Sequence, residues 1–353
     1  MNHQKELENL ILTIAREHAS DLHISAGQRP TIRVSGSLIP LLKREVLSAG
    51  DVSKFAELLM TPDKLKIFLD TKEIDFSYQF QDGIRFRGNA FYQRGLIGIA
   101  LRLIPSSIKT VAELNLPPIL ESFTRRKQGF FLTVGPVGQG KSTTLASMIE
   151  MINKEKAVHI LTIEDPIEYL FEPKKSLVDQ REVSIDTKSF PVALRAAFRQ
   201  DADVMMIGEM RAHETISTAV TAAETGHLVL STLHTNTAAQ TIDRIIDSFP
   251  AEQQRQISRQ LASSLIGVLS QRLIQRVSGG LVPAVELLIN NNAVASLIRE
   301  GRTHEINVLI ETGSQHGMID MNRSLADLVR RGEITQENAY LYSFNAKALE
   351  KFL

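Results

Sequence analysis

The sequence predicts an α/β protein with two parts of different construction. In residues 21–104, short strands follow one another on tight turns, which is typical of an antiparallel sheet with helices on one side. From Phe130 onward, apolar strand segments alternate with helical segments, which is typical of a buried, mainly parallel sheet. After about Leu281 the pattern becomes mostly helical. We therefore expect an α+β domain over residues 1–105, a linker over 106–127 and an α/β domain over 128–353, with its helical part beginning near residue 285.

The elements of the first domain follow from apolar spacing and turn residues. Residues 1–20 carry apolar side chains at helical spacing, namely Leu7, Leu10, Ile11 and Ile14, with charged residues between them. This pattern predicts an amphipathic helix and not a signal peptide. Glycine and proline divide the following segments into short pieces. We expect strands at 22–25, 31–34, 37–41, 74–80, 84–92 and 97–104, and helices at 52–60 and 63–69.

The second domain is expected to contain four buried strands separated by helices. We expect these strands at 130–134, 159–164, 204–208 and 228–233, after a linker that contains a short helix. Near the C-terminus, Met321, Leu325, Leu328 and Val329 give one helix an apolar face.

Composition and charge narrow the range of functions. There are 40 Lys+Arg and 40 Asp+Glu residues, and this balance disfavours a nucleic acid as the main partner. There is no cysteine, which excludes disulfides and cysteine zinc sites and fits a reducing compartment. No apolar run approaches the ~18 residues of a membrane span. We therefore expect association with a membrane only through a partner.

A phosphate-binding loop is the strongest functional signal in the sequence. Residues 135–142 read Gly-Pro-Val-Gly-Gln-Gly-Lys-Ser, which fits the P-loop pattern between an expected strand and an expected helix. Glycines let backbone N–H groups point at phosphate oxygens, and a helix N-terminus adds a favourable dipole. Lys141 is expected to contact the β- and γ-phosphates, and Ser142 to ligate Mg²⁺. The expected nucleotide-binding residues here are Gly135, Pro136, Val137, Gly138, Gln139, Gly140, Lys141, Ser142 and Thr143. A glycine-rich turn with a solvated lysine is the disfavoured alternative.

Two strand ends supply the acids that ATP hydrolysis needs. One strand finishes in Glu209, the Walker B position, which is expected to be catalytic and to hold Mg²⁺. The other leads into Glu164, Asp165 and Glu168 around a proline. Three carboxylates beside one turn repel one another unless a cation or a donor compensates. Beside a P-loop we therefore interpret them as part of a metal and water site, and not as an acidic surface loop. The residues alone do not separate Glu164 from Glu168.

Histidines and arginines are further candidates. His227 and His234 flank one strand, where a hydrogen bond to the γ-phosphate and a structural role both remain open. Arg85 and Arg87 share one face of an expected strand, and Arg102 lies on the next strand. Each arginine taken alone fits a solvated sheet face. Together they could reach a nucleotide on the other domain or on the next subunit, where arginine neutralises charge during phosphoryl transfer.

Several segments, taken in order, resemble motifs of the secretion and pilus ATPase superfamily, and most closely those of type IV pilus retraction ATPases. These segments are 19–27, 85–91, 163–168, 206–211, 226–235 and 297–301. They resemble the family's N-terminal signature, arginine strand, Asp box, Walker B, His box and C-terminal motif, and the likeness covers essentially the whole chain. Val137 and Gln139 stand where the family usually has Thr and Ser. We expect both positions to tolerate the change because the backbone makes the phosphate contacts.

The resemblance implies a PAS-like N-terminal domain joined to a RecA-like ATPase domain, in proteins that form hexameric rings. It implies ATP and Mg²⁺ as cofactors and assigns roles residue by residue. Glu209 and Glu168 are then catalytic acids with Glu164 as a further candidate, His227 and His234 are His-box residues, and Arg85, Arg87 and Arg102 are nucleotide-directed arginines. The implied partners are other copies of the chain, an inner-membrane pilus platform protein and related pilus ATPases. The implied location is cytoplasmic, peripheral at the inner face of the membrane.

We therefore expect a Mg-dependent ATPase motor for pilus retraction and twitching motility. An accessory pilus ATPase resembling PilU is one alternative. A pilus assembly or type II secretion ATPase is another, disfavoured by the short segment before Ser20 and by the absence of cysteines. The neutral charge disfavours a nucleic-acid translocase, and the full set of acids disfavours a regulator that binds ATP without hydrolysing it.

Overall fold

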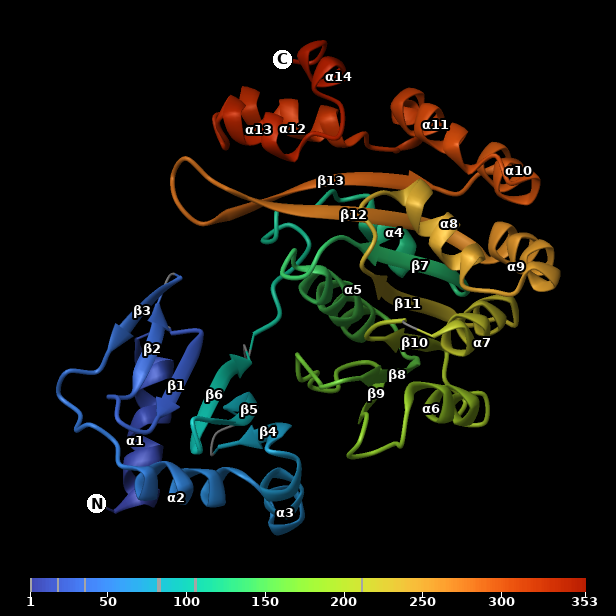
Figure 1. The fold of residues 1–353 in the computed structure, drawn as a ribbon. Helices are drawn as coiled ribbons and strands as arrows, with labels where there is room; N and C mark the ends of the chain where they lie inside the picture. The colour runs from blue at the N-terminus through green and yellow to red at the C-terminus, as the bar shows by residue number, and fades with distance from the viewer. Residues whose placement is uncertain (1, 18, 35, 81–83, 105–106, 211) are drawn as a thin grey trace. The chain divides into compact units, whose positions relative to one another are not determined.

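The structure, a computed structural model, describes residues 2–17, 19–34, 36–80, 84–104, 107–210 and 212–353. The chain divides into two compact units, Met1–Ser107 and Ile108–Leu353, which Figure 1 colours in chain order. Over the described ranges, no helix combines the length and the apolar character needed to cross a membrane.

The first unit is built on a six-stranded antiparallel sheet in the order β3-β2-β1-β6-β5-β4. Its strands are β1 (Asp21–Ser25), β2 (Thr31–Val34), β3 (Ser37–Pro40), β4 (Glu73–Gln79), β5 (Arg85–Gln93) and β6 (Leu96–Ile104). Its helices are α1 (His3–Arg16), α2 (Ala49–Leu59) and α3 (Pro62–Thr71). Each strand and helix expected in this part of the chain is present, within a few residues of its predicted bounds.

One hydrophobic core joins these helices to the sheet. Helix α1 contributes its predicted apolar face, which consists of Leu7, Leu10, Ile11 and Ile14. Burial alternates along β5, so that Phe86 points into this core while Arg85 and Arg87 lie on the other face. Arg87 pairs directly with Arg102 of β6. The three candidate arginines therefore share the face of the sheet that points away from the core.

The second unit is built on a seven-stranded sheet in the order β13-β12-β7-β11-β10-β8-β9. Its strands are β7 (Gly129–Val134), β8 (His159–Glu164), β9 (Leu177–Glu182), β10 (Val204–Ile207), β11 (Leu228–Leu233), β12 (Leu265–Gln275) and β13 (Leu281–Ile289). All neighbouring strands are parallel except β12 and β13, which are antiparallel. The four strands expected from the sequence are present and form the centre of the sheet, in the order β7-β11-β10-β8.

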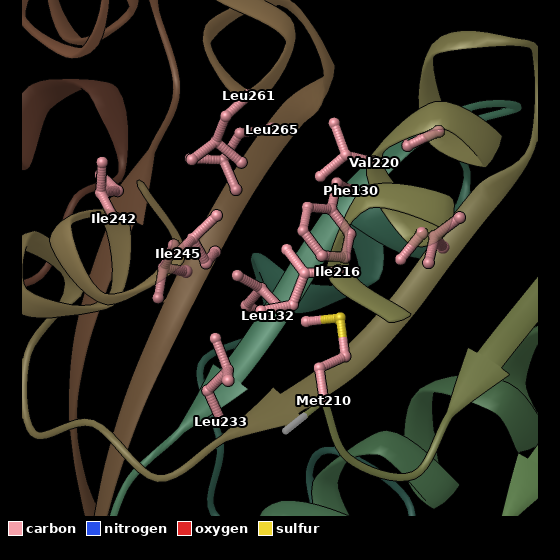
Figure 2. Packing of buried hydrophobic residues seen from close by; sticks show 14 of the residues in the cluster. Phe130, Leu132, Met210, Ile216, Val220, Leu233, Ile242, Ile245, Leu261 and Leu265 are labelled. Atoms are coloured by element: carbon pink, nitrogen blue, oxygen red, sulfur yellow. The ribbon is translucent and has the colours of Figure 1, made fainter. Parts of the chain in front are cut away.

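Helices cover both faces of this sheet. They are α4 (Leu120–Thr124), α5 (Lys141–Glu155), α6 (Phe190–Ala197), α7 (His213–Glu224), α8 (Ala238–Asp247), α9 (Ala251–Ser264), α10 (Asn292–Glu300), α11 (Ile306–Thr312), α12 (Met321–Arg330), α13 (Gln336–Tyr342) and α14 (Ala346–Glu350). Successive side chains of β7 point to opposite faces of the sheet and so contribute to two cores. Phe130 and Leu132 pack with α7, α8 and α9, and Phe131 packs with α4 and α5. Figure 2 shows Phe130 beside Ile216 and Val220 of α7. The predicted α/β fold class is confirmed.

Three strands of the second unit were not expected, namely β9, β12 and β13. Strand β12 buries Ser270, Gln271 and Arg272 in its interior, and these polar residues interrupt the apolar run by which a buried strand is predicted. Strand β13 extends to Ile289, so the expectation that the chain turns helical near Leu281 or residue 285 is wrong. The apolar residues of β13 are interrupted by Pro283 and Glu286, so no strand periodicity distinguishes this segment from a buried helix. The helical part begins with α10.

Candidate active site

The phosphate loop lies between the end of β7 and the start of α5, as expected. Gly135, Gly138 and Gly140 have φ angles of 146°, 79° and 78°, which residues with a side chain rarely adopt. Such a curl gathers backbone N–H groups in front of a helix N-terminus, an arrangement that binds anions. A methyl group on Gly138 would meet nothing within 4 Å. The middle of the loop is therefore open, and the loop fits a phosphate group.

Lys141 is the first residue of α5, and it is only 7% exposed. Its Nζ donates to the carbonyl oxygens of Gly135 at 2.9 Å and Pro136 at 2.8 Å, and lies 3.3 Å from Nδ1 of His234. Burial lowers the pKa of Lys141 to about 8, against the opposing effect of nearby carboxylates. The ammonium group is thus poorly hydrated and held beside the loop, where a phosphate would restore the lost interactions.

Neighbouring parallel strands bring Glu209 and His234 to the same end of the sheet as the loop. Glu209 follows β10 and His234 follows β11. The distance from His234 Nε2 to Glu209 Oε2 is 3.3 Å. The charge of Glu209 also acts on Lys141. Lys141, His234 and Glu209 therefore form a continuous series of contacts across the end of the sheet, as the positions of these residues after their strands predict.

Glu164 and Glu168 occupy different environments in the acidic turn after β8. Glu164 is 5% exposed, and its Oε1 accepts hydrogen bonds from Thr162 Oγ1 at 2.6 Å and Gln180 Nε2 at 3.2 Å. Its Oε2 accepts from the backbone N–H of Glu168 at 3.3 Å. Burial raises the pKa of Glu164 to about 7, although these hydrogen bonds oppose the rise. Glu168 is half-buried, and its charge acts on Lys141.

Strand β9 and helix α5 hold the rest of this acidic turn. Gln180 of β9 donates to the carbonyl oxygen of Tyr169 at 2.8 Å and accepts from the backbone N–H of Phe171 at 2.8 Å. The hydroxyl of Tyr169 lies 2.8 Å from Thr143 Oγ1 in the first turn of α5. Ser142, the predicted Mg²⁺ ligand, is half-buried next to Thr143. The turn is therefore tied to the same helix terminus as the phosphate loop.

Strand β12 forms a second wall of the phosphate loop. Gln271 Nε2 donates to the carbonyl oxygen of Gln139 at 2.7 Å, and Gln271 Oε1 accepts from Thr144 Oγ1 at 2.7 Å. The side chain of Gln139 is also engaged, because its Oε1 accepts the backbone N–H of Leu273 at 2.7 Å. The side chain of Gln139 therefore takes part in holding the loop, in addition to the backbone contacts expected at this position. No sequence signal identified Gln271, because β12 itself was not expected.

The structure does not bring His227 to this end of the sheet. His227 precedes β11, whereas the loop, Glu209 and His234 follow their strands. A six-residue strand spans about 20 Å. The ring of His227 has its Nδ1 2.9 Å from the carbonyl oxygen of Ala222, and it meets Phe198 edge-on at a centroid distance of 5.6 Å. Of the two interpretations left open for His227, the structural one fits this unit.

The candidate arginines Arg85, Arg87 and Arg102 all belong to the first unit. Arg102 Nε donates to Asp21 Oδ1 at 2.9 Å, while the Arg102 side chain remains 70% exposed. Burial acts to raise the pKa of Asp21, but hydrogen bonds from Ser20 and Arg102 outweigh it and lower that pKa. Arg102 is thus anchored at one guanidinium nitrogen and exposed over most of its length. Arg85 and Arg87 are half-buried on the neighbouring strand.

The parallel sheet, the glycine loop before α5 and the buried lysine define a P-loop nucleotide-binding protein. The chain belongs to the Type II/IV secretion system protein family, whose model matches residues 3–339. It is 44% identical to the type IV pilus retraction ATPase PilT of Pseudomonas aeruginosa, over 95% of this chain and 97% of that protein. It is 40% identical to the type IV pilus ATPase PilU of the same organism, over 98% of this chain and 90% of that protein. A crystal structure of the pilus retraction motor PilT with bound ADP superposes with a TM-score of 0.91, at 45% identity, covering 97% of this chain and 98% of that one.

Proposed function

We propose that this protein is a Mg-dependent ATPase motor that drives the retraction of type IV pili. One observation carries the proposal: a formed phosphate loop, with acids at two neighbouring strand ends, in a chain 44% identical to PilT over 95% of its length. The fold likeness to PilT with bound ADP supports a nucleotide as ligand. Identity to PilU is lower, at 40%, so the retraction ATPase is favoured over the accessory one.

The loop residues and Lys141 would bind the phosphates of the nucleotide. Lys141 Nζ already lies at the open side of the loop, held by two carbonyl oxygens. When a phosphate enters, the ammonium group exchanges these neutral acceptors for charged oxygens, which form stronger hydrogen bonds. The loop N–H groups and the α5 dipole add to this attraction. These groups also stabilise the charge that is redistributed over the phosphate oxygens in the transition state of phosphoryl transfer.

Ser142 and Glu209 would hold Mg²⁺ together with the nucleotide. Across the described residues, no three or more His, Asp or Glu side chains are grouped so as to hold a metal ion alone. Mg²⁺ takes one or two protein ligands and completes its shell with phosphate oxygens and water. When bound, the ion neutralises charge on the β- and γ-phosphates. Ser142 supplies a hydroxyl beside Lys141, and Glu209 supplies a carboxylate across the sheet end.

The hydrogen bonds support different roles for the two acids that the sequence left undivided. Glu164 uses both carboxylate oxygens within the protein, and burial raises its pKa to about 7. It is therefore suited to fixing the turn. Glu168 is more exposed, and its charge acts on Lys141, so it is suited to orienting the attacking water and accepting its proton. We assign Glu168 and Glu209 to the reaction and Glu164 to support of the turn.

The motor is proposed to work as a homohexameric ring at the cytoplasmic face of the membrane. Its first unit, the PAS-like domain, supplies Arg85, Arg87 and Arg102 to a nucleotide held by the second unit, the RecA-like domain, of the same or a neighbouring chain. Arg102 supports this role because most of its side chain is exposed while Asp21 fixes one nitrogen. Force then reaches the pilus through an inner-membrane platform protein and related pilus ATPases. The chain contacts the membrane through those partners.

Deletion and complementation in a piliated host test the proposal. Loss of the gene is expected to give cells with excess surface pili that do not twitch, and wild type should restore twitching while Lys141→Ala should not. Cells without pili would instead indicate an assembly ATPase. Normal retraction that fails only when a second retraction ATPase is impaired would indicate an accessory role.

A further inference from the structure

Two glutamines connect the phosphate loop to β12: Gln139 belongs to the loop and Gln271 to the strand. Gln271 reaches from the strand to the carbonyl oxygen of Gln139 and to the hydroxyl of Thr144, both at 2.7 Å. Gln139 reaches from the loop to the backbone N–H of Leu273 at 2.7 Å. Three short hydrogen bonds therefore tie the last part of the loop and the first turn of α5 to one strand.

The same strand leaves no space for a side chain at the first and last glycines of the loop. A methyl group on Gly135 would lie 2.6 Å from the carbonyl oxygen of Gln271, and one on Gly140 would lie 2.8 Å from Gln271 Nε2. These glycines are thus needed for the close approach of β12 as well as for their φ angles. The loop has room for a side-chain atom at Gly138 and none at Gly135 and Gly140, where it faces β12.

Strand β12 is itself held firmly at this point. Arg272 is 5% exposed and donates to the carbonyl oxygen of Gln271 at 2.8 Å and to Asn236 Oδ1 at 3.0 Å. Its charge acts on buried Glu286 of the adjacent strand β13. A strand held by these contacts can impose a shape on the loop.

We propose that Gln139 and Gln271 are positioning residues that hold the phosphate loop in its anion-binding shape before a nucleotide arrives. This inference rests on the proposed nucleotide-binding function. Gln139 is expected to contact the phosphates through its backbone, whereas the side-chain atoms of both glutamines contact the protein itself. A loop that is ordered in advance binds more tightly, since binding need not order it. Loss of these bonds should therefore weaken nucleotide binding and leave the hydrolysis step intact.

The decisive variant is Gln139→Met, which keeps the length of the side chain and removes the oxygen that accepts the Leu273 N–H. We expect the Kd for MgADP and the KM for ATP to rise about five- to tenfold, as loss of one hydrogen bond implies. The kcat should stay within about twofold of wild type. Gln271→Met removes two bonds and should have the larger effect. Gln256→Met, on the exposed surface of α9, should change none of these values.

The outcomes separate this proposal from its alternatives. If Gln139→Met lowers the Tm of the free protein but leaves Kd and KM unchanged, the contact is only structural and the proposal is overturned. A fall in kcat at unchanged KM would overturn it as well, because it would place Gln139 in the chemical step. In the double variant, the effects of two changes in one connected contact should be less than additive in free energy. A wild-type protein that binds no MgADP would overturn the proposed function itself.

Discussion

Burial brings two glutamates of the second unit into the neutral pH range. Glu286 of β13 is 5% exposed and accepts the backbone N–H of Ala238 at 2.7 Å. Burial raises its pKa to about 7, with Asp320 acting in the same direction and Arg272 against it. Glu164 has a pKa raised to about 7 for the same reason. These carboxyl groups link stability to pH, and Lys141 links nucleotide binding to pH.

The stability effect of Glu286 has a defined sign. Because its folded pKa of about 7 lies above the ordinary value of 4.5, the folded protein binds more protons than the unfolded chain between these values. Stability therefore falls as pH rises through this window. Glu286→Gln keeps an acceptor for Ala238 and removes the titration. Its stability relative to wild type should rise between pH 5 and pH 8, by at most about 3 kcal/mol.

Denaturant unfolding at both pH values measures this change. Glu252→Gln, which alters an exposed glutamate on α9, provides the control, and its difference in stability from wild type should be the same at both pH values. An equal difference between Glu286→Gln and wild type at pH 5 and pH 8 would contradict the account.

The depressed pKa of Lys141 predicts a pH limit for nucleotide binding. Burial lowers this pKa to about 8, so the free protein loses the ammonium charge as pH rises above that value. A bound phosphate favours the charged form, and the Kd for MgADP should therefore rise above pH 8 by up to about tenfold per pH unit. Calorimetric titration at pH 7, 8 and 9 measures this. A Kd that stays constant to pH 9 would contradict the combination of a lowered Lys141 pKa and a contact between Lys141 and phosphate.

At the scale of elements, the wall formed by β12 predicts unequal effects of two loop glycines. Gly138→Ala places a methyl group in open space, so only its φ of 79° is unfavourable, by about 1–2 kcal/mol. At Gly135 the φ is 146°, and the added methyl group of Gly135→Ala would also lie 2.6 Å from a backbone oxygen of β12. A backbone atom in a paired strand cannot move away as the end of a flexible side chain can. Gly135→Ala should destabilise the free protein by about 1–3 kcal/mol more than Gly138→Ala. Thermal and denaturant unfolding without nucleotide compare the two, and equal losses would contradict the close approach of β12.

Some elements of the site could be predicted from the sequence because their signal is local. The strands β7, β8, β10 and β11 are short apolar runs, and parallel strands gather whatever follows them at one end of a sheet. This rule places Glu209 and His234 beside the loop. It also places His227, which precedes β11, at the other end, so strand direction favours the structural interpretation of His227.

Other parts of the site could not be predicted because they depend on contacts between distant residues. Gln271 lies on β12, whose buried polar residues hide its strand pattern. The separation of Glu164 from Glu168 depends on Gln180 of β9, a strand that was also missed. Each of these contacts joins residues that are far apart in the chain and that meet only in the folded sheet. No regular spacing in the sequence therefore predicts it.

At the scale of the whole molecule, the arginines of the first unit predict how subunits share a site. If Arg102 acts on the nucleotide of a neighbouring chain, Arg102→Ala and Lys141→Ala proteins should each be inactive alone and regain part of the turnover when mixed in one ring. A Lys141→Ala chain binds no nucleotide but still offers Arg102 to its neighbour. Restoration is measured by ATP hydrolysis across a range of mixing ratios. Full activity of Arg102→Ala alone would mean that Arg102 is only a solvated residue of the sheet face, held by Asp21.

Steady-state ATP hydrolysis by the purified protein in the presence of Mg²⁺ tests the central claim most directly. Lys141→Ala and Glu209→Ala are measured beside wild type, with circular dichroism to confirm that each variant is folded. We expect turnover in wild type; it should be lost on chelation of Mg²⁺ and reduced at least about a hundredfold in both variants. Turnover that persists in folded Lys141→Ala, or no turnover in wild type alone or with pilus-base partners, would contradict the central claim.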